Sequence, residues 1–287
     1  MRSRYWLILL AAGPATAFAW GDGCEFRADR GAGVDAKGVE KVIIRAGAGD
    51  MKVVGRSNAV RVEARGVACA AKQELLDRTQ ISVRREGNVV YVETDLPQNG
   101  ENWKWLGNEY AYLDIGIALP SNLPVEAVDS SGDAVFEDLK ALQLQDSSGD
   151  LEISRVAELA DVSDSSGDLE VDSAGSVRVR DSSGDIEIDN VRGDVDVVQD
   201  SSGDIHVEKV ASNVRIEQDS SGDIRVEDVK GSFVVDSDSS GSIYAMNING
   251  DFTVSDDSSG DIEHESIGGK VTIPADKRDP DDSDVEK

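Results

Sequence analysis

The sequence has few of the residues that build most metal centres and nucleophilic active sites. It contains two cysteines and two histidines, and no Cys-x-x-Cys pair. Because His206 and His264 lie far apart in the chain, a zinc site or a cysteine nucleophile is poorly supported. In an oxidising compartment, a single pair of cysteines is more often a disulfide than two free thiols. We therefore expect Cys24 and Cys69 to be bonded to each other.

Basic residues are also scarce. The chain has 29 Lys and Arg against 57 Asp and Glu, a formal net charge of −28, and the acidic residues are spread along its length. Such a field repels phosphate backbones, which excludes nucleic acid as a partner. The acidic surface is explained most simply by solubility, and a specific cationic ligand is the alternative.

Long apolar runs are missing as well. Residues 1–19 have a basic start with Arg2 and Arg4, an apolar stretch at Leu7–Ala12 and the small-x-small pattern Ala17-Phe18-Ala19. This is typical of a secretory signal peptide. The apolar stretch is far shorter than the roughly 20 residues that span a bilayer. We expect an exported protein without a membrane span, periplasmic or secreted.

One five-residue motif, Asp-Ser-Ser-Gly-Asp, is abundant. Eight copies occur at intervals of 17–19 residues, and the seventh ends in Ser242 instead of Asp. The copies start at Asp129, Asp146, Asp164, Asp181, Asp200, Asp219, Asp238 and Asp257. A short fixed period is typical of stacked repeats, in which each unit buries its apolar side only against its neighbours.

The residues between motifs indicate two short strands per repeat. After Gly184, the apolar positions are Ile186, Ile188, Val191, Val195 and Val197, two alternating pairs with one apolar residue at a corner. This pattern, rich in β-branched residues, predicts strands and not helices. We predict an all-β fold, a parallel β-solenoid over residues 113–273 with about eight coils. At about 4.8 Å per coil, the rod would be roughly 40 Å long.

Residues 20–112 predict a separate N-terminal β segment that caps the solenoid. Strands are expected within 39–54 and 60–64, and a hairpin within 81–93 around Glu86-Gly87-Asn88. Ala48-Gly49-Asp50 is similar to a divergent copy of the motif turn. Residues 274–287 have no apolar pattern and are expected to form a disordered acidic tail.

Aromatic residues make up only 5% of the chain, yet four gather in one short stretch, at Trp103, Trp105, Tyr110 and Tyr112. Exposed rings on a loop can stack against carbohydrate, which makes these four residues candidates for ligand binding. Equally, they can cover the open end of the solenoid, which needs a cap to hide its core. We favour the cap.

The repeated aspartates are candidate calcium ligands. If the register holds, the first aspartates of the motifs form one column and the last ones a second, so that neighbouring carboxylates repel by about 1 kcal/mol per pair. Calcium bound between turns would remove that cost. The candidates are Asp146, Asp150, Asp164, Asp168, Asp181, Asp185, Asp200, Asp204, Asp219 and Asp223. Alternatively, Asp, Ser and Gly are present as turn formers, with carboxylates splayed into water and no cofactor bound. We favour the turn role.

An enzyme would need a place where the repeat breaks to form a cleft. Carbohydrate-active enzymes on β-helices have long loops that carry catalytic carboxylates, whereas these repeats are nearly uniform. His264, at a position that is usually apolar, and Ser242 depart from the pattern, and we interpret both as relaxation in the last coils.

The segment Leu113–Asp133 and the recurrent Ser-Gly-Asp-Ile/Leu pattern resemble the bacterial putative-adhesin family of β-strand repeat proteins. The resemblance implies an exported β-solenoid without established catalytic residues. We therefore expect a non-enzymatic envelope protein with a binding or structural surface, whose partner is an unidentified envelope or extracellular protein or glycan. A calcium-binding solenoid and a carbohydrate-active enzyme on a β-helix are the alternatives.

Overall fold

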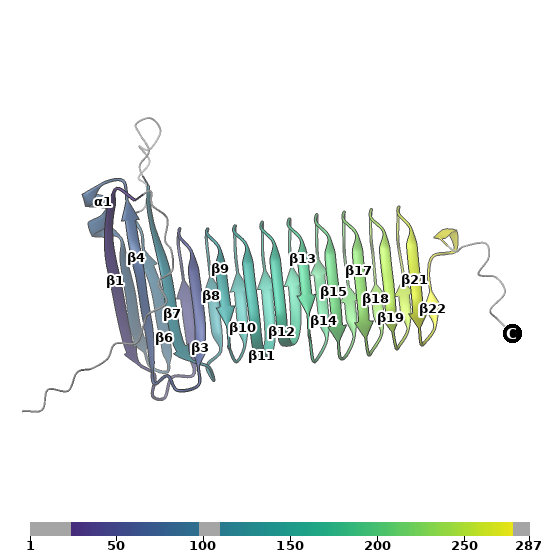
Figure 1. The fold of residues 1–287 in the computed structure, drawn as a ribbon, viewed down its shortest axis with the longest axis horizontal. Coiled ribbons are helices and arrows are strands. Elements are labelled where there is room, and N and C mark those ends of the chain that lie inside the picture. The colour runs from purple at the N-terminus through teal and green to yellow at the C-terminus, as the bar shows by residue number, and fades with distance from the viewer. Residues whose placement is uncertain (1–23, 98–109, 278–287) are drawn as a thin grey trace, which may run out of the picture.

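The computed structural model describes residues 24–97 and 110–277, which form a rod of stacked β-strands with a broader N-terminal end (Figure 1). Two short helices accompany the strands, α1 (Gln73–Arg78) and the 3₁₀ helix η1 (Ala275–Lys277). The predicted signal peptide lies outside the described residues. The all-β class and the parallel solenoid are confirmed.

Each coil contains one strand before the motif and one after it. In one coil, β14 (Val195–Gln199) precedes Asp200–Asp204 and β15 (Ile205–Val210) follows. β14 pairs in parallel with strands of the coils on either side, and so does β15. The rod therefore has two parallel sheets, joined along one edge by the motifs. We call this edge the motif edge.

The first sheet consists of the strands that precede the motifs and their N-terminal counterparts. In spatial order these are β6 (Val89–Asp95), β2 (Lys41–Arg45), β8 (Val125–Val128), β10 (Leu142–Gln145), the last parts of β11 (Leu151–Ser163) and β12 (Leu169–Arg180), β14, β16 (Val214–Ile216), β18 (Phe233–Val235), β20 (Phe252–Val254) and β22 (Val271–Thr272).

The second sheet consists of the strands that follow the motifs. In spatial order these are β7 (Ala111–Pro120), β3 (Met51–Arg56), β9 (Ala134–Glu137), the first parts of β11 and β12, β13 (Ile186–Asp189), β15, β17 (Ile224–Val229), β19 (Ile243–Ile248) and β21 (Ile262–Ile267). The parallel stack thus includes β2 and β3, upstream of residue 113. The turn at Ala48 bridges to Ser131 of the first motif, as the similarity of the two turns suggested.

The N-terminal end is closed by antiparallel strands. β1 (Phe26–Asp35) pairs with β4 (Arg61–Ala70), which pairs with β7 and so extends the second sheet. β5 (Gln80–Glu86) forms the predicted hairpin with β6 at the end of the first sheet. α1 buries Leu76 beside these strands. The predicted β segment that caps the solenoid is therefore present.

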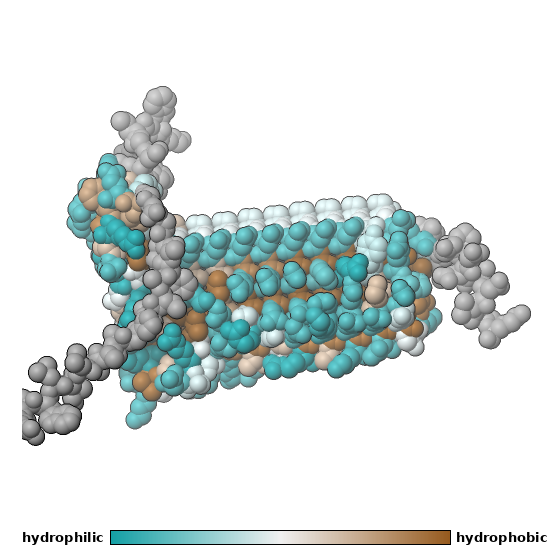
Figure 2. Space-filling model, in the orientation of Figure 1, coloured by the Kyte–Doolittle hydropathy of each residue, from teal (hydrophilic) through white to brown (hydrophobic). Residues whose placement is uncertain are grey.

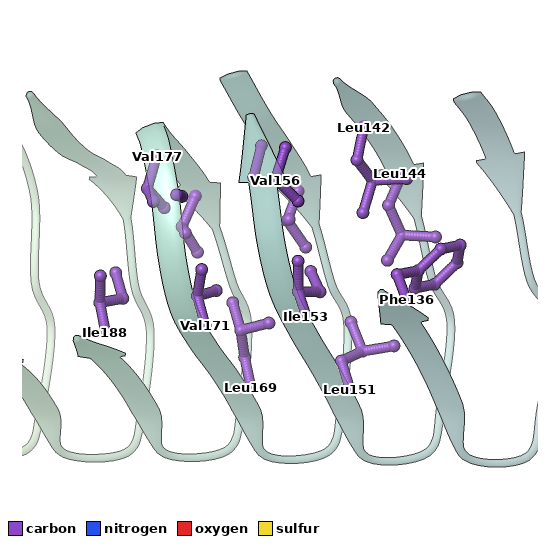
Figure 3. Packing of buried hydrophobic residues seen from close by; sticks show 14 of the residues in the cluster. Phe136, Leu142, Leu144, Leu151, Ile153, Val156, Leu169, Val171, Val177 and Ile188 are labelled. Carbon is purple, nitrogen blue, oxygen red and sulfur yellow. The ribbon is translucent and has the colours of Figure 1, made fainter. Parts of the chain in front are cut away.

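The core runs between the two sheets along the whole rod (Figure 3). Ile186, Ile188, Val191, Val195 and Val197 are all buried, as the repeat pattern predicted. In Figure 3 the side chains of successive coils, such as Ile153 and Val171, stand in line from one coil to the next. The register keeps these positions opposite each other, so that each coil covers the apolar surface of its neighbour.

The two long edges of the rod turn the chain in different ways. On the motif edge, Gly222 has φ +132°, and a Cβ on it would lie 1.8 Å from the carbonyl oxygen of Gly203 in the preceding coil. Glycine is required there by both conformation and space. On the other edge, non-glycine residues adopt the left-handed conformation: Asp138, Arg155, Ser173, Asn190, Lys209, Asp228, Asn247 and Ser266.

Candidate functional site

The first aspartates of the eight motifs form one column inside the motif edge, which we call the inner column. All eight are buried, with exposed fractions between 0% and 5%. In β10 the alternation continues through the motif, since Leu142, Leu144 and Asp146 are buried while Gln143 and Gln145 are exposed. The expectation that these carboxylates splay into water is therefore wrong, because the strand period points them into the core. The burial of these aspartates could have been predicted by continuing the alternation of buried and exposed residues two positions beyond the last apolar residue of the strand.

Contacts in the inner column alternate from coil to coil. Asp129, Asp164, Asp200 and Asp238 each accept a backbone N–H from a serine of their own motif, at 2.7–3.3 Å. No donor in the described structure reaches either carboxylate oxygen of Asp146, Asp181 or Asp219. At the C-terminal end, the ammonium group of Lys277 lies 3.1 Å from Oδ2 of Asp257. No pattern in the sequence predicted the position of Lys277.

Burial changes the acidity of these groups. Loss of hydration disfavours a buried carboxylate and raises its pKa. Burial, together with the negative charge of neighbouring carboxylates in the column, raises the pKa of Asp146, Asp181 and Asp219 to about 7. Burial also raises the pKa of Asp129, Asp200 and Asp238, to about 6. The pKa of Asp164 is also raised by burial.

The last aspartates of the motifs form a second, exposed column, which we call the outer column. Oδ1 of each carboxylate accepts the backbone N–H of the equivalent residue in the next coil. Asp168 N–H donates to Asp150 at 3.1 Å, and Asp185 N–H donates to Asp168 at 3.0 Å. The pattern continues until Ser242 N–H donates to Asp223 at 2.8 Å. The outer aspartates thus tie adjacent coils together.

The serines and the glycine complete the contacts between motifs. The second serine donates its hydroxyl to the carbonyl of the first serine one coil earlier, as Ser221 does to Ser201 at 3.2 Å. The glycine N–H donates to the backbone carbonyl of the second serine in the next coil, as Gly222 does to Ser240 at 3.2 Å. Each residue of the motif therefore has a structural role.

The ten candidate calcium ligands are divided between the two columns. Asp146, Asp164, Asp181, Asp200 and Asp219 are inner and buried, whereas Asp150, Asp168, Asp185, Asp204 and Asp223 are outer and exposed. Across residues 24–97 and 110–277, no group of three or more His, Cys, Asp or Glu residues is arranged to hold a metal ion. The calcium hypothesis stays a prediction.

Of the aromatic candidates, Trp103 and Trp105 lie outside the described residues. Tyr110 and Tyr112 are half-buried at the start of β7, with ring centroids 6.2 Å apart. The hydroxyl of Tyr110 accepts the N–H of Glu25 at 3.3 Å. The two tyrosines are therefore placed at the capped end of the rod, and their ligand-binding role stays a prediction.

The Cys24–Cys69 disulfide is present at this same end. It attaches the start of the described chain to β4, and Cys69 lies opposite Tyr112 in the pairing of β4 with β7. In the last coil, His264 faces Phe252 with the rings 6.0 Å apart. Among the described residues, no helix is both long and apolar enough to span a membrane.

The outer surfaces of the two sheets carry different charge patterns. On the second sheet, Glu170 lies opposite Glu152 and Glu187. We call this surface the acidic face, defined by Glu152, Glu170, Asp172, Glu187, Asp189, Glu208 and Glu227. Toward the C-terminal end its charge is partly compensated, because Lys209 pairs with Asp189 and Glu208, and Arg225 pairs with Glu227. On the first sheet, the sequence Asp161, Arg178, Asp196 and Arg215 alternates in sign from coil to coil, and we call this surface the mixed face. Figure 2 shows residues of similar hydropathy aligned in rows along the rod.

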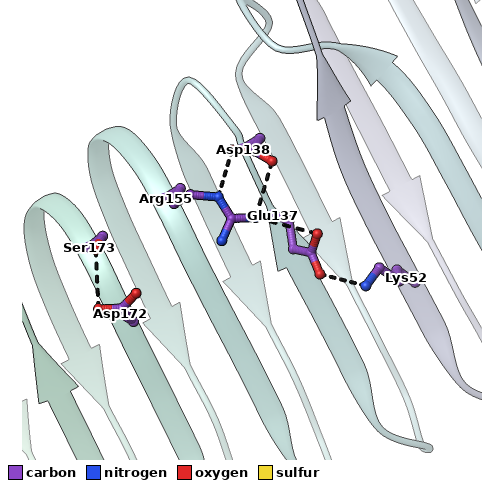
Figure 4. A network of polar contacts seen from close by, with 6 residues as sticks. All are labelled: Lys52, Glu137, Asp138, Arg155, Asp172 and Ser173. Carbon is purple, nitrogen blue, oxygen red and sulfur yellow. Dashed lines mark hydrogen bonds and ion pairs between the residues drawn. The ribbon is translucent and has the colours of Figure 1, made fainter.

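An open hollow of about 550 Å³ lies near the junction of the cap and the solenoid, lined by Arg56, Ser57, Asn58, Ser121, Asp138 and Arg155 among others. Arg155 is already paired, at 2.7 Å from Asp138 and 3.4 Å from Glu137 (Figure 4). Lys52 binds the other side of Glu137, so these charges form a network that connects β3, β9 and β11. The network joins adjacent strands and leaves neither carboxylate isolated in an apolar pocket.

The chain is similar to several solved structures and matches one family model. No curated protein matches the chain in sequence. Among solved structures, a putative lipid binding protein from Parabacteroides distasonis shares 15% identity, covering 88% of this chain and 98% of that one, with a TM-score of 0.43. A putative adhesin from Bacteroides fragilis shares 14% identity over 87% and 96% of the two chains, with a TM-score of 0.42.

A second putative adhesin, from Parabacteroides merdae, shares 11% identity over 88% of this chain and 98% of that one, with a TM-score of 0.35. The family model described as Toastrack DUF4097 matches residues 112–273, more than half of the chain. This span coincides with the repeats and the strand that leads into them. The chain belongs to the Toastrack DUF4097 family.

Proposed function

We propose that the protein is an exported, non-enzymatic component of the cell envelope that presents a rigid acidic β-solenoid as a binding or structural surface. The observation that carries this proposal is the acidic face. Like charges in adjacent coils repel by about 1 kcal/mol per pair in water. The mixed face of the same coils avoids this cost by alternating charges, which supports a role for the acidic face in interaction and not in stability.

Export is supported by the signal-like residues 1–19 and by the Cys24–Cys69 disulfide, which is typical of an oxidising compartment. The compartment is the periplasm or the exterior. The partner is an envelope or extracellular protein or a glycan with positively charged or hydrogen-bonding groups toward the acidic face. Some solved structures of similar fold are described as putative adhesins, in keeping with a binding role.

A non-enzymatic role is supported by the environment of the surface carboxylates. Glycosidases raise the pKa of one carboxyl by holding it in an apolar pocket next to a second, ionised carboxyl. Beside the hollow, the guanidinium of Arg155 instead lowers the pKa of Asp138. The buried aspartates with raised pKa values lie inside the motif edge, where a polymeric substrate has no access.

The test compares two triple variants with equal loss of charge. Glu152→Gln, Glu170→Gln and Glu187→Gln remove three negative charges from the acidic face. Asp161→Asn, Asp196→Asn and Asp236→Asn remove three from the mixed face, where Asp236 is the ion-pair partner of Arg215. Binding of labelled protein to envelope fractions and glycans is measured at low and high salt. We expect the first variant to lose about tenfold in affinity at low salt and the second to bind like the wild type.

Equal effects of the two variants would contradict a role for the acidic face. New reducing ends in the glycan samples would instead indicate a carbohydrate-active enzyme. A separate variant with Trp103→Ala and Trp105→Ala tests glycan recognition by the aromatic stretch.

A further inference from the structure

Within residues 24–97 and 110–277, the inner column places eight carboxyl groups in adjacent coils, and the cation that pairs with it is Lys277, at Asp257. Eight aspartates lie in line, and all are at least nine-tenths buried. The core residues Leu144 and Leu151 flank Asp146 in sequence and are equally buried. Ionised carboxylates at this spacing and in these surroundings would pay both a desolvation cost and mutual repulsion. The column must therefore contain something that reduces its charge.

The contacts within the column indicate what that is. Asp129, Asp164, Asp200 and Asp238 are provided with serine N–H donors, which stabilise a carboxylate. The aspartates between them, Asp146, Asp181 and Asp219, have no donor on either oxygen within the described structure. A group that lacks donors but lies beside acceptors is suited to the protonated form, since its own O–H can donate.

The positions of these groups in the column support this assignment. Asp146 lies between Asp129 and Asp164, and Asp219 lies between Asp200 and Asp238, so each of these carboxyl groups has a neighbouring carboxylate on either side. Because serine N–H donors stabilise negative charge on the neighbours, the proton is best placed on the group between them.

We propose that the inner column is a proton-binding site, in which Asp146, Asp181 and Asp219 are protonated at neutral pH. The site thus couples the stability of the solenoid to the acidity of its surroundings.

Other charged groups near the inner column either favour or oppose proton binding. Asp50 at the N-terminal end, and Asp150 and Asp185 of the outer column, add negative potential at Asp129, Asp164 and Asp200. These groups favour proton binding. At the opposite end, the ammonium group of Lys277 lies 3.1 Å from Asp257 and neutralises its charge, whereas protons do so at Asp146, Asp181 and Asp219.

The sign of the pH effect follows from linkage. A carboxyl whose pKa is about 7 in the folded state and about 3.8 when unfolded keeps its proton in the folded state over the window between these values. Its contribution to stability is complete below about pH 4 and is lost progressively as the pH rises through about 7. Over this window the inner column makes the protein more stable in acid, the reverse of the usual effect of salt-bridged carboxylates.

Infrared spectroscopy of the full-length protein in chelator tests the proposal directly. We expect the C=O band of protonated carboxylic acids in the folded wild type at pH 7. As the pH rises, the intensity of this band should fall with a midpoint near pH 7. The melting temperature should rise as the pH falls from about 8 to about 5. Absence of the acid band at neutral pH in the folded protein would overturn the proposal, and this measurement needs no variant.

Matched variants locate the effect. Asp181→Asn and Asp219→Asn replace a protonated carboxyl by a neutral group of the same shape that can still donate. Together they should raise the melting temperature at pH 8, reduce its pH dependence and weaken the acid band. The outer control, Asp204→Asn with Asp223→Asn, should leave the band and the pH dependence unchanged.

Calcium binding is the alternative way to neutralise the inner column, and the same variants test it. If cations neutralise the column, CaCl₂ raises the melting temperature at pH 8, chelator lowers it, and the inner Asn variants lose this response together with stability. That result would overturn the proton assignment and support calcium binding instead.

Discussion

The two aspartates of one motif are four residues apart and chemically identical, yet they have opposite environments. Asp181 is buried with an exposed fraction of 2%, and burial raises its pKa to about 7. Asp185 is exposed and accepts the backbone N–H of Asp204 at 2.9 Å. The difference arises from the turn between them, in which Ser-Ser-Gly reverses the chain. A repeated residue type in a solenoid therefore has no single role, because its position relative to the strand period decides whether it meets water or core.

We expect the largest loss of stability from a substitution in the turn of the motif. Gly222→Ala places a Cβ 1.8 Å from the carbonyl oxygen of Gly203, in a left-handed conformation. We expect a loss of at least about 3 kcal/mol in the free energy of unfolding, measured by urea denaturation, because backbone atoms of two coils must separate. This separation would disturb both columns at once.

The control for this variant is Gly87→Ala in the β5–β6 hairpin. Gly87 also has a positive φ, +63°, but a Cβ there meets nothing within 4 Å. It should cost only about 1 kcal/mol from conformational strain. Equal losses in the two variants would mean that stacking of the glycines contributes nothing.

A substitution in the outer column should cause a smaller loss of stability. Asp185→Ala removes the acceptor of the Asp204 N–H. We expect a loss of about 1 kcal/mol, typical of one hydrogen bond, and little change of this loss between pH 6 and pH 8. Asp185→Asn keeps an acceptor oxygen and should retain most of the stability. A loss with Asn as large as that with Ala would indicate that the charge, and not the hydrogen bond, matters at this position.

The smallest effect is expected where the sequence has already interrupted the outer column. Ser242 stands in place of the last aspartate of the seventh motif. Ser242→Asn supplies a side-chain oxygen toward the N–H of Asp261 and should stabilise the protein by about 0.5 kcal/mol. Ser242→Asp should gain less, because Asp223 and Asp261 are close by and carry the same charge. Urea midpoints of the two variants measure the difference, and a gain for Asp that exceeds that for Asn would contradict the hydrogen-bond explanation.

The fold could be predicted from the sequence because every repeat shows the same pattern of inward-facing apolar residues. The same inward positions recur in every coil, as with Ile205, Val207 and Val210 followed by Ile224, Val226 and Val229, and all of them are buried. The hairpin around Gly87 was also predictable from the local sequence. What local patterns could not show is that β2 and β3 stack on β8 and β9 while the intervening chain builds the cap, because this pairing depends on contacts distant in sequence.

The candidate site was only partly predictable. The two aspartate columns followed from the period alone, but the burial of the first column did not, because Asp is usually exposed in turns. Lys277 could not be connected to Asp257, since η1 folds back onto the last motif only in three dimensions. The ion pair that closes one end of the inner column is thus a tertiary feature without a sequence signal.

The identical stacking of coils also makes the length of the rod adjustable independently of its ends. Because each motif contacts only the motifs before and after it, a duplication or loss of one whole coil would preserve every neighbouring contact. Each such event would move the capped end and the Lys277 end apart or together by about 4.8 Å. The length of the solenoid can therefore change only in fixed steps, and in its later coils one step corresponds to 19 residues.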